Sequence, residues 1–245
     1  MIDDMATTRR RKKPGDRGNP LKKRLRKQRE AVYRQAISEA AERVFAEKGS
    51  DRSRMREIAA EAGISLGTLY GVVDGKQSLF VGIHETRVHE FLGCIRSARD
   101  AHEGTLESHL AVLRSGAEYF LARPDFLRMC CRDGYGWASA FPASTRGSDL
   151  WNEGISIPRE LFARGIAEGI YVDEDPGLLA RKMLAIKQVE LTHWVEQRMD
   201  TDPEVILARL EDQFIRAFCK PARQERLEPH PRKSRGSDPS TSTSH

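Results

Sequence analysis

Three groups of residues have types that often perform chemistry: two histidines near a glutamate, a lysine after a glycine, and two adjacent cysteines. His84 and His89 flank Glu85 in an order that resembles the zinc-binding helix of metalloproteases, but they are five residues apart instead of four. On a helix the two rings would point about 140° apart, so they could not bind one metal ion. We interpret both histidines as surface or packing residues.

The lysine and the cysteines also lack the spacing that their chemistry requires. Gly75-Lys76-Gln77 lacks the Ser or Thr that follows the lysine of a phosphate-binding loop. Cys130 and Cys131 are adjacent, which is poor spacing for metal ligands, and we expect them to pack in the interior. A redox-sensing role for this pair is the alternative. The sequence therefore predicts a protein that is not an enzyme and that has no metal or other cofactor.

Basic side chains are concentrated near the N-terminus, where they could bind a phosphate backbone. Residues 1–80 hold 19 basic and 11 acidic residues, and twelve of the basic ones fall within residues 9–29. We predict that residues 1–23 form a disordered arm that contacts DNA phosphates by displacing counterions, and that Lys23, at its end, and Arg24, at the start of the following helix, bind DNA. The alternative is a solvated tail. A membrane-surface role is disfavoured, because residues 9–20 have no apolar face to insert.

The remaining composition describes a chain with a sizeable core and few cysteines. With 245 residues, of which 39% are hydrophobic, one or two domains are expected. The chain has no run of about 18 apolar residues and no signal-peptide pattern, so we expect neither membrane insertion nor secretion. Four cysteines fit a reducing, cytoplasmic location. Residues 221–245 contain four prolines and a Ser/Thr-rich end, which predicts a disordered tail.

The most specific pattern runs from Met55 to Val72 and is typical of a helix-turn-helix. Ala59 provides the small residue where two helices cross, and Gly63, four residues later, can adopt the positive φ of a tight turn. Ile64 would fill the corner from inside, and Ser65 can cap the second helix. The rest of the inner face would be formed by Ile58, Ala62, Leu69 and Val72. The alternative is an ordinary corner between two helices.

These residues must be positioned by helices, because no window of the sequence alternates apolar and polar residues as a strand does. The preceding apolar stripe, which includes Ile37, Val44 and Phe45, can close a three-helix domain. We therefore predict an all-α fold. Ser53, Asp175 and Asp202 are expected to cap helices. The predicted helices span 24–48, 54–61, 65–72, 76–101, 105–122, 124–131, 147–168, 176–199 and 203–219.

Four segments together resemble the TetR (tetracycline-repressor-like) family of transcriptional regulators. They are A-I-S-E-A-A-E-R-V-F-A-E-K-G from Ala36, M-R-E-I-A-A-E-A-G from Met55, S-L-G-T-L-Y from Ser65 and K-Q-S-L-F from Lys76. The resemblance covers residues 30–80. It implies a three-helix helix-turn-helix DNA-binding domain at 24–80, followed by a helical effector-binding and dimerisation domain at 81–220.

The resemblance also implies roles for single residues. Arg56 matches a base-contacting position, Tyr70 a phosphate-contacting tyrosine, and Lys76 a phosphate-binding lysine. The exposed N-terminal face of the recognition helix matches Ser65, Leu66, Gly67 and Thr68. A hydroxyl and an ammonium on either side of such a helix would fix its register on DNA. The chain departs from the family at Tyr70-Gly71-Val72-Val73, where a second aromatic residue is usual.

The second half of the chain is expected to bind a small molecule and a second copy of the chain. Aromatic residues at helical spacing are usually core, but the resemblance implies that some line a ligand cavity. Our candidates are Tyr119, Phe126, Trp137, Trp151, His193 and Trp194, with residues 133–147 as a mobile gate. The wide apolar faces of the last two helices predict a homodimer that binds a palindromic operator. The alternative is a monomeric bundle.

Together these observations predict a cytoplasmic transcriptional regulator that binds double-stranded DNA, more specifically a repressor that a small-molecule effector releases. Two alternatives remain at this stage. One is a dimeric DNA-binding protein without an effector, and the other is a helical ligand-binding or enzymatic protein whose corner motif is incidental.

Overall fold

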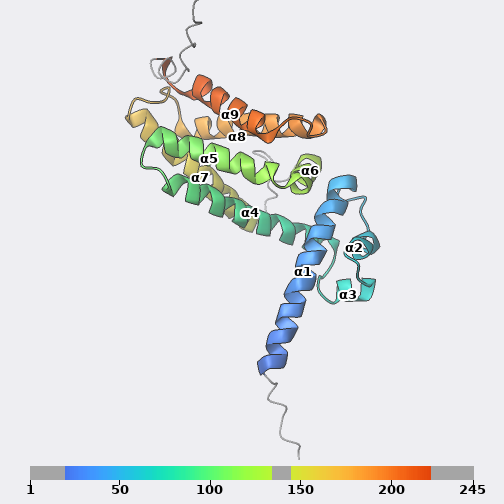
Figure 1. The fold of residues 1–245 in the computed structure, drawn as a ribbon. Helices are drawn as coiled ribbons and strands as arrows, with labels where there is room; N and C mark the ends of the chain where they lie inside the picture. The colour runs from blue at the N-terminus through green and yellow to red at the C-terminus, as the bar shows by residue number, and fades with distance from the viewer. Residues whose placement is uncertain (1–19, 134–144, 222–245) are drawn as a thin grey trace, which may run out of the picture. The chain divides into compact units, whose positions relative to one another are not determined.

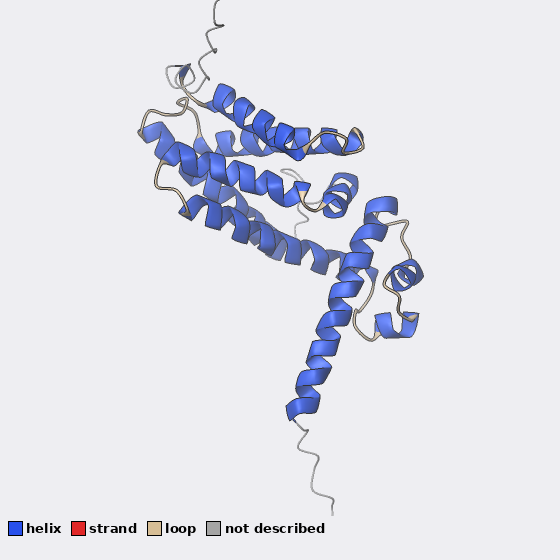
Figure 2. Ribbon diagram, in the orientation of Figure 1, coloured by secondary structure: helices blue, strands red, loops and turns tan. Residues whose placement is uncertain are grey.

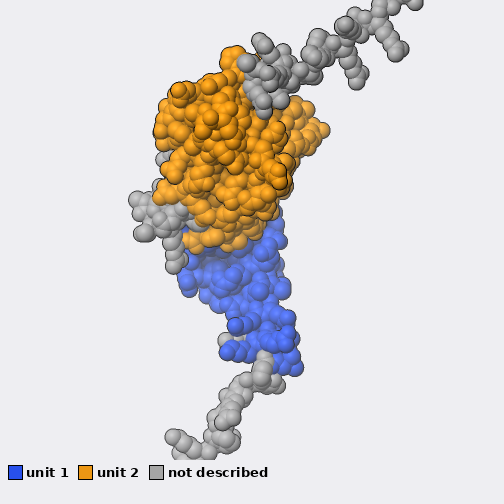
Figure 3. Space-filling view, turned by 90° about the vertical axis from the view of Figure 1, so that its left-hand side faces the viewer, with its two compact units in different colours: residues 1–83 blue, residues 84–245 orange. Residues whose placement is uncertain are grey.

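The computed structural model describes residues 20–133 and 145–221, and every regular element in these two ranges is a helix. The predicted all-α fold is confirmed. The chain divides into two compact units, Met1–Ile83 and His84–His245, which Figure 3 shows in different colours. The predicted arm before residue 20, the predicted tail after residue 221 and most of the predicted gate lie outside the described residues.

The helices agree with the predicted ranges to within a few residues, and Figures 1 and 2 show their arrangement within each unit. The main differences are at two ends. The first helix begins at Pro20, four residues before the predicted start, and the eighth ends at Glu196, three residues early. The elements are α1 Pro20–Lys48, α2 Met55–Glu61, α3 Leu66–Tyr70, α4 Lys76–Asp100, α5 Thr105–Leu121, α6 Pro124–Asp133, α7 Thr145–Ala167, α8 Pro176–Glu196 and α9 Pro203–Phe218.

Local capping signals account for several helix ends. Asp175 and Asp202 accept hydrogen bonds from backbone N–H groups in the first turns of α8 and α9, as predicted. Ser53 does not cap α2, so that prediction is wrong. The N-cap of α2 is Arg54, whose N–H donates to the Glu57 carboxylate at 2.9 Å. The hydroxyl of Ser53 instead donates to the carbonyl of Gly49, at the end of α1.

The first unit is a three-helix domain closed by the start of α4. The apolar stripe of α1 is buried, with Ile37, Ala40, Ala41 and Phe45 completely inaccessible. Phe45 packs edge-on against Phe80 of α4, with ring centroids 5.5 Å apart. Upstream of Ala36 the side chains of α1 are exposed or half-buried where they are described, so this half of the helix extends beyond the core.

In the second unit α5 is the central helix. It packs against α6, α7, α8 and α9, and most of its side chains are buried. At one end of this unit His109 lies within an aromatic cluster formed by Phe162, Tyr171, Phe214 and Phe218. This cluster joins α5, α7, α9 and the loop before α8. None of the helices within 20–133 and 145–221 combines the length and apolar character that a membrane crossing requires.

Candidate nucleic-acid interface

The turn between α2 and α3 has the backbone geometry that the sequence predicts. Gly63 has a φ of +66°, which glycine adopts without steric cost. The N–H of Ile64 bonds to the carbonyl of Ala59, and the N–H of Gly63 bonds to that of Ala60. These two bonds form a Schellman motif, which ends α2 and reverses the chain toward α3.

The second helix of the motif presents one side to solvent. Ser65 is its N-cap, and the Ser65 hydroxyl accepts a hydrogen bond from the Thr68 N–H at 3.1 Å. Leu69 is buried against the domain, whereas Leu66 and Tyr70 are 42% and 55% exposed. The predicted contact residues of α3 therefore have surfaces that a DNA groove could reach.

The departure at Gly71 affects the end of this helix. Gly71 is the C-cap of α3, so the helix ends before Val72 and the predicted inward position shifts by one residue. Val73 is buried and Val72 is half-buried, although we predicted Val72 for the inner face. The N–H groups of both valines bond to the carbonyl of Leu69, which keeps the chain close to the domain after α3.

Lys76 has an intramolecular role that its motif position does not reveal. Its ammonium donates to the carbonyls of Asp51 and Ser53, at 3.0 and 3.1 Å. These bonds tie the start of α4 to the loop between α1 and α2. An ammonium has three donors, so two carbonyls leave a third N–H for a phosphate oxygen.

The other predicted contacts lie on α1 and α2. Arg56 is exposed in the first turn of α2, and Lys23 and Arg24 are exposed near the start of α1. Lys23 is thus part of a helix and not of the flexible arm that we predicted. The motif brings Arg56 and the α3 residues together on adjacent helices, whereas Lys23 and Arg24 come from the extended half of α1.

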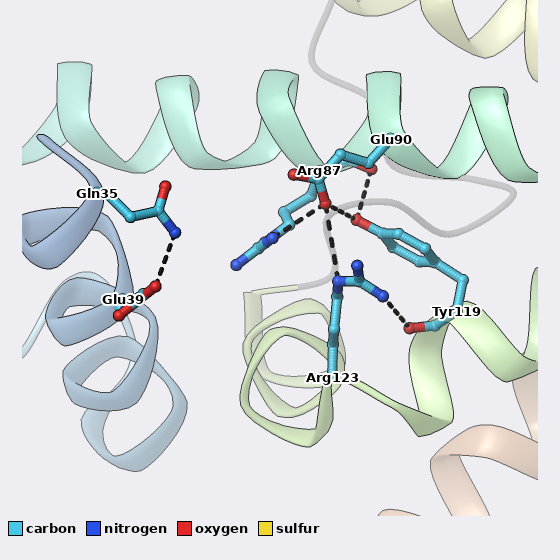
Figure 4. Close-up of polar contacts among 6 residues, drawn as sticks. All are labelled: Gln35, Glu39, Arg87, Glu90, Tyr119 and Arg123. Carbon is cyan, nitrogen blue, oxygen red and sulfur yellow. Dashed lines mark hydrogen bonds and ion pairs between the residues drawn. The ribbon is translucent and has the colours of Figure 1, made fainter. Parts of the chain in front are cut away.

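In the second unit, the Tyr119 side chain forms part of an internal polar network (Figure 4). Its hydroxyl lies 2.8 Å from the Glu90 carboxylate and 2.9 Å from the carbonyl of Arg87. The guanidinium of Arg123 lies 4.0 Å from the centroid of the Tyr119 ring and forms an ion pair with Glu90. The network joins α4, α5 and the loop before α6, so Tyr119 has a structural role that we did not predict.

The remaining predicted ligand contacts do not converge on one described pocket. Phe126 is buried against Phe120 and His84, and the Trp194 indole donates to the carbonyl of Thr201. His193 is exposed on α8. Trp137 lies outside the described residues, and the structure describes only the backbone of Trp151, in α7.

An open groove of about 350 Å³ runs between α5 and α9, and it contains none of these candidates. Arg114 forms ion pairs there with Glu118, Glu204 and Glu211. The lining side chains are His102, Glu107, Leu110, Ala111, Arg114, Ser115, Glu118 and Glu211.

Lys187 is a buried cation that our sequence analysis missed. It lies on the core face of α8, is 6% exposed, and its ammonium faces the rings of Phe91 at 4.9 Å and Phe120 at 5.7 Å. No acidic side chain of the described ranges forms an ion pair with it. Burial lowers the pKa of Lys187 to about 8. The signal in the sequence was a lysine within the apolar stripe of Leu179, Met183, Leu191 and Trp194.

The favourable free energy of the two ring contacts is smaller than the free-energy cost of burying this charge. A cation–π contact contributes roughly 0.5–2 kcal/mol, whereas removing an ammonium from water costs several kcal/mol even after relaxation. The charged Lys187 ammonium therefore destabilises the folded chain.

Two histidines and two cysteines of the second unit are also in or near the core. Burial lowers the pKa of His84 to about 4 and that of His109 to about 3, so both rings are neutral at pH 7. His89 is exposed, in agreement with a surface or packing role for the pair. Cys130 is buried, and burial raises the pKa of Cys131, which disfavours the reactive thiolate.

A comparison with protein families matches residues 37–83 to the family described as bacterial regulatory proteins, tetR family. This range includes both helices of the motif and the turn between them. A search of curated protein sequences finds no match.

Solved structures of bacterial transcriptional regulators share the fold of this chain over about three quarters of its length. The ketosteroid regulator KstR2 of Mycobacterium tuberculosis matches with a TM-score of 0.66 at 20% identity, over 76% of this chain and 95% of that one. FadR from Bacillus subtilis, solved in complex with stearoyl-CoA, matches at 0.64 and 17%, over 74% and 97%. PfmR from Thermus thermophilus matches at 0.63 and 20%, over 74% and 97%.

Proposed function

We propose that the chain is a TetR-family transcriptional regulator, and more specifically a homodimeric repressor that a small-molecule effector releases from a palindromic operator. The exposed side of α3 is the observation that carries this proposal. Ser65, Leu66 and Tyr70 are accessible there, on a helix whose opposite side is anchored by the buried Leu69. Such a helix can enter the major groove and contact both bases and phosphates.

Specificity would come from few side chains. Leu66 can contact a thymine methyl group, and Thr68 and Arg56 can form hydrogen bonds to base edges. Tyr70 and Lys76 would bind phosphates on either side of the groove, and Lys23 and Arg24 would add phosphate contacts from α1. We further propose the domain limits 24–80 and 81–220 for DNA binding and for effector binding with dimerisation.

Exposed apolar side chains on α8 and α9 support the proposed dimer. Val189 is 66% exposed and Val205 is 49% exposed, although the opposite faces of both helices are buried within the chain. Pairing of these faces with their copies would remove apolar surface from water. A two-fold dimer would match the symmetry of a palindromic operator.

Effector release is supported by one structural neighbour, FadR from Bacillus subtilis, which was solved with stearoyl-CoA. An effector can shift the protein between two states only if it binds them with different affinity. Such an effector would favour a state with weaker operator binding.

Fluorescence anisotropy tests the DNA-binding part of the proposal. We would titrate the full chain onto a duplex from the region upstream of its own gene and onto a scrambled duplex, at several salt concentrations. Selective binding that is weakened by Tyr70→Phe and lost in Tyr70→Ala is expected. Equal, weak binding to both duplexes would contradict recognition by α3 and leave only non-specific phosphate contacts.

A further inference from the structure

Among the residues that the structure describes, one ammonium is buried in the apolar interior of the second unit, between α4, α5 and α8. Lys187 projects from α8, and the side chains against its ammonium are Phe91 on α4 and Phe120 on α5. Gly116 of α5 also adjoins it, because a Cβ at that position would lie 3.3 Å from the Lys187 Nζ and 3.3 Å from the Phe91 ring. The absence of a side chain at Gly116 therefore leaves room for the ammonium.

The position of Lys187 in α8 is one that an apolar residue would fill at no electrostatic cost. Its neighbours along the buried face of the helix, Met183 and Leu191, are apolar and almost inaccessible. A buried charge is destabilising unless it is paired, and two ring faces only partly replace water around it. A lysine here gains a favourable role when an anion binds beside it.

We propose that Lys187 binds the carboxylate of an amphipathic effector whose apolar body lies against the aromatic and aliphatic side chains of α4 and α5. This assignment rests on the proposed effector-responsive function and specifies its ligand. Phe91 and Phe120 would contact the apolar body, and so would Ile95, which lies beside Gly116.

The site favours a single negative charge over a phosphate. Burial alone accounts for the lowered pKa of Lys187, with no contribution from another charged group of the described chain. A phosphate dianion beside this one ammonium would keep an unbalanced buried charge, whereas one carboxylate would neutralise it. The carboxylate and Lys187 would form a charge-assisted hydrogen bond.

Three probes of equal length and different charge test the proposal: decanoate, decanol and decylamine. We would measure their binding to the full chain by calorimetry and by the shift in Tm. Decanoate is expected to bind the wild type and to bind Lys187→Met about tenfold more weakly or worse, as the loss of a charge-assisted bond predicts. Decanol should bind both proteins equally, and decylamine should bind the wild type more weakly than decanol.

Lys182→Met is the matched control, because Lys182 lies on the same helix but is exposed and pairs with Glu174 at 2.6 Å. It should bind decanoate as the wild type does. Equal affinity of decanoate for the wild type and for Lys187→Met, or no binding to either, would overturn the proposal. Should Lys187→Met not fold, the ¹³Cε signal of Lys187 in the wild type replaces it. Decanoate should raise its titration midpoint, and an unchanged midpoint would also overturn the proposal.

The two measurements test the anion site and the regulatory function separately, so either proposal can be refuted while the other stands. Lys187-dependent binding of decanoate without any effect on operator affinity would keep the anion site and refute the effector role. Operator binding that responds to other compounds, with no dependence on Lys187, would refute the anion site and keep the proposed regulator.

Discussion

The hydroxyl of Tyr171 lies 3.0 Å from Nδ1 of His109, inside the aromatic cluster that joins α5, α7 and α9. Both side chains are completely buried, and His109 packs edge-on against Phe162 and Phe214. The other ring nitrogen of His109, Nε2, has no hydrogen-bond partner among the described residues. The pair thus forms a polar contact inside a cluster of aromatic rings.

Gly165 makes room for this arrangement, so we expect Gly165→Ala to be strongly destabilising. A Cβ at Gly165 would lie 2.3 Å from the Tyr171 ring, and Tyr171 has no space into which it could move. Overpacking of this kind costs about 1–3 kcal/mol or more. Urea denaturation measures the loss. Gly93→Ala is the control, since a Cβ there meets nothing within 4 Å in the middle of α4, and this variant should be neutral or slightly more stable.

The buried histidines predict a loss of stability in mild acid. The pKa of His84 is lowered to about 4 and that of His109 to about 3, below the ordinary value of 6.5 that applies to the unfolded chain. As the pH falls below 6.5, these histidines become protonated in the unfolded state but stay neutral in the folded state. The free energy of unfolding therefore decreases. Each histidine should contribute a loss of about 2 kcal/mol between pH 8 and pH 5.

Urea midpoints at these two pH values check the expectation. In His109→Gln the dependence should be about half as steep, although this variant is less stable at every pH. An unchanged slope in His109→Gln would show that the ring is protonated in the folded chain.

Lys187 predicts a second pH dependence, in alkali and of the same sign. Its pKa of about 8 lies below the 10.5 of an unperturbed lysine, so between these values the unfolded chain is protonated and the folded chain is not. The free energy of unfolding should therefore rise as the pH increases from 8 to 10.5, by up to about 3 kcal/mol. Lys187→Met should remove this rise and be more stable than the wild type at pH 7. A wild type and variant with parallel profiles would contradict the uncompensated charge.

Lys76 and Tyr70 should respond differently to substitution. Lys76→Met removes two hydrogen bonds to the loop carbonyls of Asp51 and Ser53 and, on our proposal, one phosphate contact. It should lower the free energy of unfolding by about 1–3 kcal/mol and also weaken DNA binding. Tyr70→Phe should weaken DNA binding alone, because Tyr70 is exposed. Thermal denaturation measures the effect on stability, and fluorescence anisotropy measures the effect on DNA binding. A Lys76→Met variant of unchanged stability would contradict the structural role of Lys76.

The proposed dimer predicts a specific effect of charge on α8. Val189→Glu would place a carboxylate within the apolar contact and should shift the protein from dimer to monomer. Analytical ultracentrifugation reports the mass directly. Val81→Glu, at another exposed valine, is the control and should leave the mass of the wild type unchanged. A Val189→Glu dimer as stable as the wild type would exclude α8 from the interface.

Features that depend on neighbours in the sequence were predictable. Gly63 and Ser65 set the turn and the cap of the motif through their own backbone and side chain, and Asp175 and Asp202 do the same for α8 and α9. Periodic apolar residues then defined the helices. These are local effects, so the sequence contains all the information that they require.

Features that depend on distant contacts were missed. Ser53 bonds to α1 and not to α2, because the end of α1 folds back over it. Tyr119 satisfies its hydroxyl through Glu90, on a different helix, and Lys187 is buried by Phe91 and Phe120. No spacing within one helix reveals which side chains another helix brings near. The pocket candidates were chosen by residue type, which cannot distinguish a core aromatic from a lining one.

The loop between α7 and α8 is joined by backbone hydrogen bonds to the residues after α9. The N–H of Val172 donates to the carbonyl of Phe218, and the N–H of Lys220 donates to that of Ile170. Cys219, between them, is buried. A truncated gene product that stopped before Cys219 would leave the carbonyl of Ile170 without this hydrogen bond and remove the buried Cys219 from its place beside Tyr171. Cys219 and Lys220, which follow α9, are therefore needed to complete this unit.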